Sequence, residues 1–162
     1  LNLPTENSVL DLATGSGILA AAFSERGHRV SGFDFSQKML TRAQTKFPQI
    51  DFKLFDLNDL HSVNDDFVDI VSMGYFLHGA SADFRKFVLQ QAARISRKQV
   101  IIFDYCCSGN WLIHFIEWIE GSYFNEFVRL GRASEFAEAG LQIEQELNFS
   151  DYGSCWICSR SK

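Results

Sequence analysis

VLDLATGSGILA, residues 9–20, is the stretch that decides the fold of this 162-residue chain. An apolar run carries one acid, Asp11, passes into a glycine turn and then becomes apolar again. This pattern predicts a buried strand over residues 8–13 and a helix over residues 18–26 that stops at Gly27. A turn with glycine lets a ligand approach the backbone, and the amides that start the helix can face that ligand.

Strands and helices alternate along most of the chain, which predicts a parallel sheet covered on both faces. The last two predicted strands are joined by the short turn at 150–153, so they must run antiparallel. We therefore expect an α/β, doubly wound mixed sheet in a three-layer αβα arrangement. The predicted strands are 8–13, 28–33, 51–55, 67–73, 99–105, 141–149 and 154–159; the later helices are 37–46 after the N-cap Ser36, 82–95, and 135–139 after Ser134 as N-cap.

Composition indicates one globular domain over residues 1–162, since 46% of the residues are hydrophobic and 22% are charged. The formal net charge of −5 argues against a nucleic-acid partner, because phosphate contacts need a basic face. No apolar run has membrane-spanning length and no signal peptide is recognised, so we expect a cytoplasmic protein without a membrane partner.

The cysteines pose a separate question, because CWIC at residues 155–158 has the spacing of a zinc or redox site. The surrounding residues predict a strand, however, in which positions three apart point to opposite faces. We therefore expect buried, reduced thiols, with Cys155 near Cys106 or Cys107. No residue cluster indicates a metal site.

Two nucleotide classes fit the glycine turn. GSGILA, residues 15–20, matches the dinucleotide pattern G-x-G-x-x-A, and Asp34 ends the second strand, where an acid accepts hydrogen bonds from ribose. An NAD(P)-dependent oxidoreductase is therefore one alternative. Asp11 favours the other class, because a carboxylate repels a pyrophosphate but suits a ligand with a cationic sulfonium and an ammonium group.

At this point the chain resembles the class I S-adenosylmethionine-dependent methyltransferases, particularly their small-molecule type 11 branch. VLDLATGSG and GFDFSQKML (32–40) resemble the first two motifs of that family, with Ala13 in place of its first glycine. LFDLNDL (54–60) and DFVDIVSMGYFLHGA (66–80) resemble later motifs, and the likeness continues through SEFAEAGL (134–141) and the antiparallel end. The resemblance implies a Rossmann-like seven-stranded sheet with the last strand between the fifth and sixth, S-adenosyl-L-methionine as cofactor, and a small-molecule methyl acceptor.

The resemblance also implies residue roles. Asp34 would bind both ribose hydroxyls, Met39 would lie near the adenine, and Asp56 beside Leu57 would meet the adenine amino group. The end of the fourth strand would approach the methionine moiety. The full set of implied cofactor contacts is Asp11, Ala13, Gly15, Gly17, Asp34, Phe35, Met39, Asp56, Leu57, Ser72 and Met73.

The candidate catalytic residues follow the fourth and fifth strands. His78 lies in the loop that faces the methyl group in the family, and histidine suits a general base near neutral pH. Asp104 and Tyr105 end the fifth strand on the same rim, where they could contact substrate. The reaction is an in-line displacement at a methyl carbon already activated by the sulfonium, so alignment of the acceptor matters most.

The most distinctive segment is an aromatic insertion at about 108–130. It predicts a helix ending at Gly121 and a second helix capped by Ser122. Trp111, Phe115 and Trp118 share one helix face and His114 lies on another, so the insertion is an apolar lid over the acceptor, a piece of core, or the interface of a homodimer. Only residues 1–7 precede the first strand, so the family's N-terminal cap segment is expected to be missing. A non-catalytic cofactor-binding or interaction protein of the same fold is therefore a further alternative.

Overall fold

The structure is a computed structural model, and it describes residues 6–106, 123, 126–127 and 131–161. Its strands are β1 (Ser8–Leu12), β2 (Arg29–Asp34), β3 (Asp51–Leu54), β4 (Val68–Gly74), β5 (Ser96–Tyr105), β6 (Leu141–Asn148) and β7 (Gly153–Arg160). Its helices are α1 (Ile18–Ser24), α2 (Gln37–Lys46), α3 (Ala82–Ile95) and α6 (Arg132–Glu138), with 3₁₀ turns η1 (Leu57–Ser62) and η2 (Leu77–Gly79). The predicted helices within 108–130, the residues Trp111, His114, Phe115 and Trp118, and a homodimer through them lie outside the described residues.

One seven-stranded sheet runs in the order β3-β2-β1-β4-β5-β7-β6. Strand β1 pairs in parallel with β2 on one side and β4 on the other, whereas β7 pairs antiparallel with both β5 and β6. This confirms the α/β doubly wound mixed sheet and the insertion of the last strand between the fifth and the sixth. Because the strand order reverses at β1, a crevice opens at its carboxyl end, which is where open α/β sheets bind ligands.

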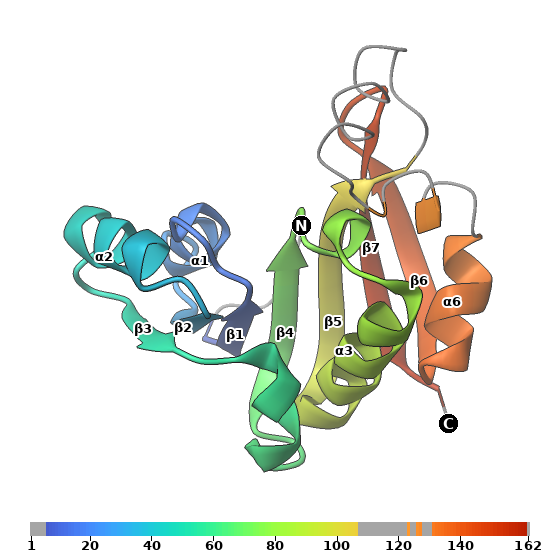
Figure 1. Cartoon of the computed structure of the whole chain (residues 1–162), viewed down its shortest axis with the longest axis horizontal. Coiled ribbons are helices and arrows are strands. Elements are labelled where there is room, and N and C mark those ends of the chain that lie inside the picture. Colours follow the sequence, from blue (N-terminus) through green and yellow to red (C-terminus); the bar gives the residue numbers. More distant parts are fainter. Residues whose placement is uncertain (1–5, 107–122, 124–125, 128–130, 162) are drawn as a thin grey trace.

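Helices cover the sheet as two layers (Figure 1), with α1 and α2 beside the β1–β3 half and α3 and α6 beside the β4–β7 half. Alternation along β1 sends Leu10 and Leu12 into the large core with α3, and Val9 into the core with α1. Strand β1 therefore contributes to both cores, which fixes its register and the direction of the groups at its carboxyl end.

Most element boundaries differ from the sequence expectations by one to three residues, and two of these differences have a clear physical reason. The predicted N-cap role of Ser134 is wrong: helix α6 begins at Arg132 after Gly131, and the Ser134 hydroxyl donates to the Gly131 carbonyl at 2.8 Å. Strand β1 ends at Leu12, because Ala13 has a left-handed φ of 52° that cannot continue a strand.

The cysteine expectations are confirmed in one respect and corrected in another. Cys155 and Cys158 lie on β7 and belong to different cores on opposite faces of the sheet, so they cannot share one zinc or redox site. Burial raises the pKa of the Cys155 thiol to about 11, which keeps it protonated at neutral pH. The expected proximity to Cys106 is wrong, because the register places Cys155 opposite Phe103. Cys107 lies outside the described residues.

A buried arginine fastens α3 to α6. Arg85 is fully buried; its Nε donates to Glu135 Oε1 at 2.6 Å and its Nη1 donates to the Ala80 carbonyl at 2.6 Å. The Phe127 ring lies between two guanidiniums, with Arg132 3.6 Å and Arg85 5.5 Å from its centroid. Arg85 thereby ties the end of η2 to α6 and to the segment at 126–127.

We predict that Arg85→Leu lowers the free energy of unfolding by about 3 kcal/mol, because it leaves the Ala80 carbonyl and the Oε1 oxygen of Glu135 without a donor, although Arg132 still donates to Glu135 Oε2 at 2.8 Å. The matched control is Lys86→Leu, which breaks the exposed Lys86–Glu138 pair between the same two helices and should cost about 0.5 kcal/mol or less. Urea unfolding of both variants measures the difference. Equal losses in the two variants would contradict the structural role of Arg85.

Candidate functional site at the carboxyl ends of the parallel strands

A buried carboxylate supports the turn after β1. Asp11 is 1% exposed; its Oδ2 accepts a hydrogen bond from Thr14 Oγ1 at 2.6 Å and its Oδ1 accepts one from Ser72 Oγ at 2.7 Å. Ser72 is itself fully buried on β4. The described contacts of Asp11 are therefore with the protein, and the side chain joins the ends of β1 and β4 beneath the turn.

Burial raises the pKa of Asp11 to about 6, and the negative charge of Asp34 adds to this effect. The hydrogen bonds from Thr14 and Ser72, and one from the Ala20 amide, act in the opposite direction but are smaller together than the cost of desolvation. Asp11 is thus a carboxyl held where a cation close by would stabilise its charged form.

The turn itself contains strained backbone. Ala13 has φ 52° and Tyr75, just after β4, also has φ 52°. A non-glycine residue in this left-handed region costs on the order of 1–3 kcal/mol and persists where the surroundings impose it, most often at functional sites. Both residues border the same cavity, described below, on neighbouring strands β1 and β4.

The two glycines of the turn have different roles. Gly15 (φ 56°) lies against the larger cavity, and a Cβ there would make ordinary contacts with the Met39 side chain at 3.5 Å and the Ala13 carbonyl at 4.0 Å. Gly17 (φ 79°) precedes α1 and faces the core, where a Cβ would approach Phe52 to 2.7 Å. Gly15 therefore keeps the backbone open toward a ligand, whereas Gly17 is required for packing.

Asp34 links this turn to the next strand. Its Oδ2 accepts from the Gly15 amide at 2.7 Å and its Oδ1 accepts from the Ser36 amide at 2.8 Å. A carboxylate oxygen has two lone pairs, so each oxygen can accept one further hydrogen bond. The carboxylate also borders a cavity, so a ligand there could donate a further hydrogen bond to each oxygen.

A smaller cavity of about 310 Å³ lies beside Asp34. Asp56 at its edge accepts hydrogen bonds at Oδ1 from the backbone amide and the side-chain amide of Asn58, at 2.9 and 2.8 Å. Exposed Phe35 and buried Leu57 supply apolar surfaces. The cavity thus combines apolar surfaces with carboxylate acceptors at its edge. The lining residues are Ala13, Asp34, Phe35, Asp56, Leu57, Asn58, Phe76 and Phe84.

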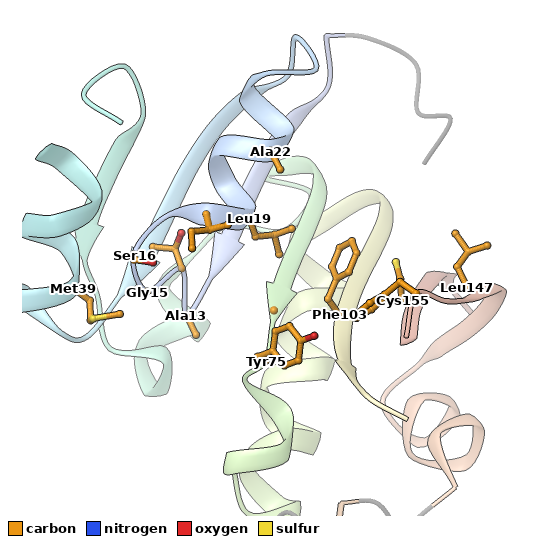
Figure 2. A pocket seen from close by; sticks show the side chains of 14 residues that line it. Ala13, Gly15, Ser16, Leu19, Ala22, Met39, Tyr75, Phe103, Leu147 and Cys155 are labelled. Carbon is orange, nitrogen blue, oxygen red and sulfur yellow. The ribbon is translucent and has the colours of Figure 1, made fainter. Parts of the chain in front are cut away.

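A larger cavity of about 760 Å³ starts at the same turn and runs across the sheet. Figure 2 shows the glycine turn and Met39 at one end, Cys155 and Leu147 at the other, and Tyr75 and Phe103 between them. Ala13 lines both cavities, so the two meet at the strained turn. The predicted contacts Ser72 and Met73 are buried beneath this surface and line neither cavity.

The candidate catalytic residues His78, Asp104 and Tyr105 lie together, next to Tyr75. Asp104 is fully buried; its Oδ1 lies 2.8 Å from His78 Nδ1, and its Oδ2 accepts from the Leu77 amide at 2.8 Å. A carboxylate at Nδ1 favours the tautomer with the proton there and leaves Nε2 as the basic nitrogen. The Tyr105 ring packs edge-on against His78, with 4.9 Å between ring centroids. The described contacts of Asp104 thus orient His78. Asp104 itself lines neither of the two cavities.

Sequence reasoning missed several residues of the site. Thr14 was not singled out, although its hydroxyl holds Asp11 and its amide donates to the Phe33 carbonyl at 2.9 Å. Tyr75 was missed too, although its place directly after the fourth strand was a usable signal. The cavity wall formed by the β6–β7 hairpin was missed as well, although the predicted insertion of the last strand beside the fifth was a usable signal for it.

Within the described residues, no group of three or more histidine, cysteine, aspartate or glutamate side chains could hold a metal ion. In the same part of the chain, no helix is both long and apolar enough to span a membrane.

We predict an unusual pH dependence from Asp11. Its carboxyl titrates near 3.8 when unfolded and near 6 when folded, so the folded state retains the proton between these values. The contribution of Asp11 to the free energy of unfolding therefore decreases as pH rises from about 4 to about 6, by about 3 kcal/mol at most. Asp11→Asn removes the titration, so its stability relative to the parent protein should improve over this interval in urea unfolding. A difference that stays constant from pH 4 to 7 would contradict the buried, proton-binding state of Asp11.

Comparison with known proteins identifies the family. The model of a methyltransferase domain matches residues 9–99. A demethylmenaquinone methyltransferase of Chlorobaculum parvum is 46% identical over 48 residues, which are 29% of this chain and 20% of that protein. A ubiquinone/menaquinone biosynthesis C-methyltransferase of Desulfotalea psychrophila is 36% identical over 96 residues, which are 57% of this chain and 38% of that protein. The chain thus spans well under half the length of these relatives.

Solved structures agree in fold. The fold matches a methyltransferase of Haloferax volcanii in complex with the Trm112 methyltransferase activator with a TM-score of 0.77 at 19% identity. The match covers 100% of this chain and 85% of that one. The magnesium protoporphyrin IX methyltransferase of Synechocystis PCC 6803, with bound SAH, has a TM-score of 0.72 at 20% identity over 99% of this chain and 76% of that one. With the glycine turn, the acid that ends β2 and the seven-stranded sheet already in place, the chain belongs to the class I S-adenosylmethionine-dependent methyltransferases.

Proposed function

We propose that the protein transfers a methyl group from S-adenosyl-L-methionine to a small molecule. The observation that carries this proposal is that two cavities share the lining residue Ala13 at the strained turn. The smaller cavity is bordered by the carboxylates Asp34 and Asp56, whereas the described lining of the larger cavity is uncharged and encloses enough space for part of the cofactor and an acceptor. A transfer reaction needs such an arrangement, because donor and acceptor must meet at one point in a fixed geometry.

In this proposal Asp34 binds the ribose hydroxyls, and Asp56 and Leu57 bind the adenine opposite Phe35. Met39 and Gly15 border the passage toward the larger cavity. Asp11 lies beneath the turn and shapes it through Thr14, so its role is to position the turn and to provide negative charge below a cationic ligand. When bound, the cofactor supplies a methyl group on a positively charged sulfur.

His78 is the proposed general base for acceptors that must lose a proton. Asp104 fixes its tautomer from the buried side, which leaves Nε2 to receive the proton. Tyr105 packs against the imidazole and restricts its rotation. Asp104 and Tyr105 are thus proposed as positioning residues for His78, in place of the substrate contact that the sequence suggested.

We also propose that residues 1–162 form one cofactor-binding domain with an insertion at about 108–130, and that the protein works in the cytosol, where the buried thiols of Cys155 and Cys158 stay reduced. An NAD(P)-dependent oxidoreductase is disfavoured, because no lysine or arginine is found among the described residues that line the two cavities. A pyrophosphate would then lie over Asp11 and Asp34 without a cation to balance its charge.

Binding of S-adenosylhomocysteine, the demethylated form of the donor, tests the proposal. Asp34→Asn keeps the size of the side chain but removes its charge, so the affinity should fall about 10- to 100-fold, because hydrogen bonds to a charged acceptor are stronger than those to a neutral one. Asp51→Asn, at an exposed acid on β3, is the control with the same change of net charge and should keep full affinity. Titration calorimetry measures both, with NADH as the comparison ligand. Tight NADH binding without S-adenosylhomocysteine binding would reject the methyltransferase proposal.

A further inference from the structure

The larger cavity has a far half that a ligand held at the glycine turn does not fill. The turn follows β1, whereas Cys155 lies on β7, and the strands β4 and β5 lie between them. Three strand spacings separate the two ends, roughly 14 Å at about 4.8 Å each. The far half is bounded by α1 on one side and by the hairpin of β6 and β7 on the other (Figure 2).

The walls of this far half are apolar. Leu19 and Ala22 project from α1, Phe103 rises from β5, and Leu147 and Phe149 come from the hairpin. The Phe103 and Phe149 rings are 6.1 Å apart between centroids and tilted by 48°, so they form one continuous aromatic wall. Phe149 is 49% exposed and Leu147 is 36% exposed, so these side chains face open space.

The described lining is also uncharged. No lysine, arginine, histidine, aspartate or glutamate is among the described residues that line the larger cavity. The two lining groups that titrate, Tyr75 and Cys155, both have raised pKa values, chiefly because burial disfavours their ionised forms. A charged ligand would therefore lose its hydration in this region without gaining a partner of opposite charge.

The aromatic wall is held in place by a glycine. A Cβ at Gly153 would lie 2.5 Å from the Phe149 ring, so the ring packs directly over the backbone at the start of β7. The Phe149 amide also donates to the Gly153 carbonyl at 3.1 Å. The hairpin therefore presents its aromatic residue toward the cavity in a defined position, as a binding wall requires.

We infer that the methyl acceptor binds in this far half, between α1 and the β6–β7 hairpin, and that it is an uncharged molecule with a flat apolar body. The acceptor atom points toward the glycine turn, and the apolar body lies against Phe103, Phe149 and Leu19. This inference rests on the proposed function, and it differs from the expectation that the aromatic insertion forms the acceptor site.

Three probes with the same biphenyl skeleton test the inference: 4-phenylphenol, which is neutral at pH 7, 4-phenylbenzoate, which is an anion, and 4-phenylbenzylamine, which is a cation. We expect saturable one-to-one binding of the phenol in calorimetry, with at least tenfold weaker binding of both charged probes. The cationic probe is the control for net charge, because the chain carries a net charge of −5, which by itself would favour binding of a cation over an anion. Equal or tighter binding of either charged probe would overturn the inference.

Two variants of α1 locate the probe. Ala22→Phe fills the cavity from its α1 wall and should weaken binding of 4-phenylphenol at least tenfold, while the affinity for S-adenosylhomocysteine stays within twofold. Ser24→Phe places the same ring on the same helix at a residue that does not line the cavity, and should leave both affinities unchanged. Phe149→Ala, at a half-exposed side chain, provides a second variant that shortens the wall without filling the cavity.

The outcomes separate the two proposals. If S-adenosylhomocysteine binds but 4-phenylphenol does not, or binds equally well to Ala22→Phe and Phe149→Ala, the acceptor assignment fails and the methyltransferase proposal stands. If 4-phenylphenol binds as expected but S-adenosylhomocysteine does not, the methyltransferase proposal fails, and with it the assignment of the occupant as an acceptor.

Discussion

The carboxylate of Asp34 is the interaction on which the site depends. It accepts the amide of Gly15 with one oxygen and the amide of Ser36 with the other. The first bond holds the turn after β1, 19 residues before Asp34 in the chain, and the second holds the start of α2, two residues after it. One side chain therefore fixes two separate backbone segments. Hydrogen bonds to an ionised acceptor are about twice as strong as neutral ones. The ligand-facing surface at the carboxyl ends of β1 and β2 is thereby formed before any ligand arrives.

Asp11 complements Asp34 from below the turn. It is buried and accepts hydrogen bonds from the hydroxyls of Thr14 and Ser72, and its burial raises its pKa. Ala13 remains in the left-handed region above it. The buried carboxyl of Asp11 and the left-handed backbone of Ala13 both lower the stability of the fold. Such unfavourable features are typical of positions shaped for binding rather than for folding.

Much of this arrangement could be predicted from sequence. The apolar run before the glycines and the acid at the end of the second strand placed the turn and Asp34 correctly, because both are local patterns with a direct structural meaning. The register of β7 could not be predicted in the same way, since it depends on pairing with a distant strand, and Cys155 accordingly lies opposite Phe103 and not Cys106. The left-handed φ of Tyr75 and the aromatic wall at Phe149 arise from tertiary contacts and leave no local pattern.

The central claim is that the cofactor binds across the carboxyl ends of β1 and β2 and is held by Asp34. Amide NMR of the ¹⁵N-labelled chain, titrated with S-adenosylhomocysteine, tests it most directly, since a ribose bound to Asp34 must alter the hydrogen bonds that its carboxylate already accepts. The account predicts that the amides of Gly15 and Ser36 are among those that shift most, together with Asn58 beside the adenine site. Saturable binding that leaves Gly15 and Ser36 unchanged and shifts amides elsewhere in the sheet would contradict it.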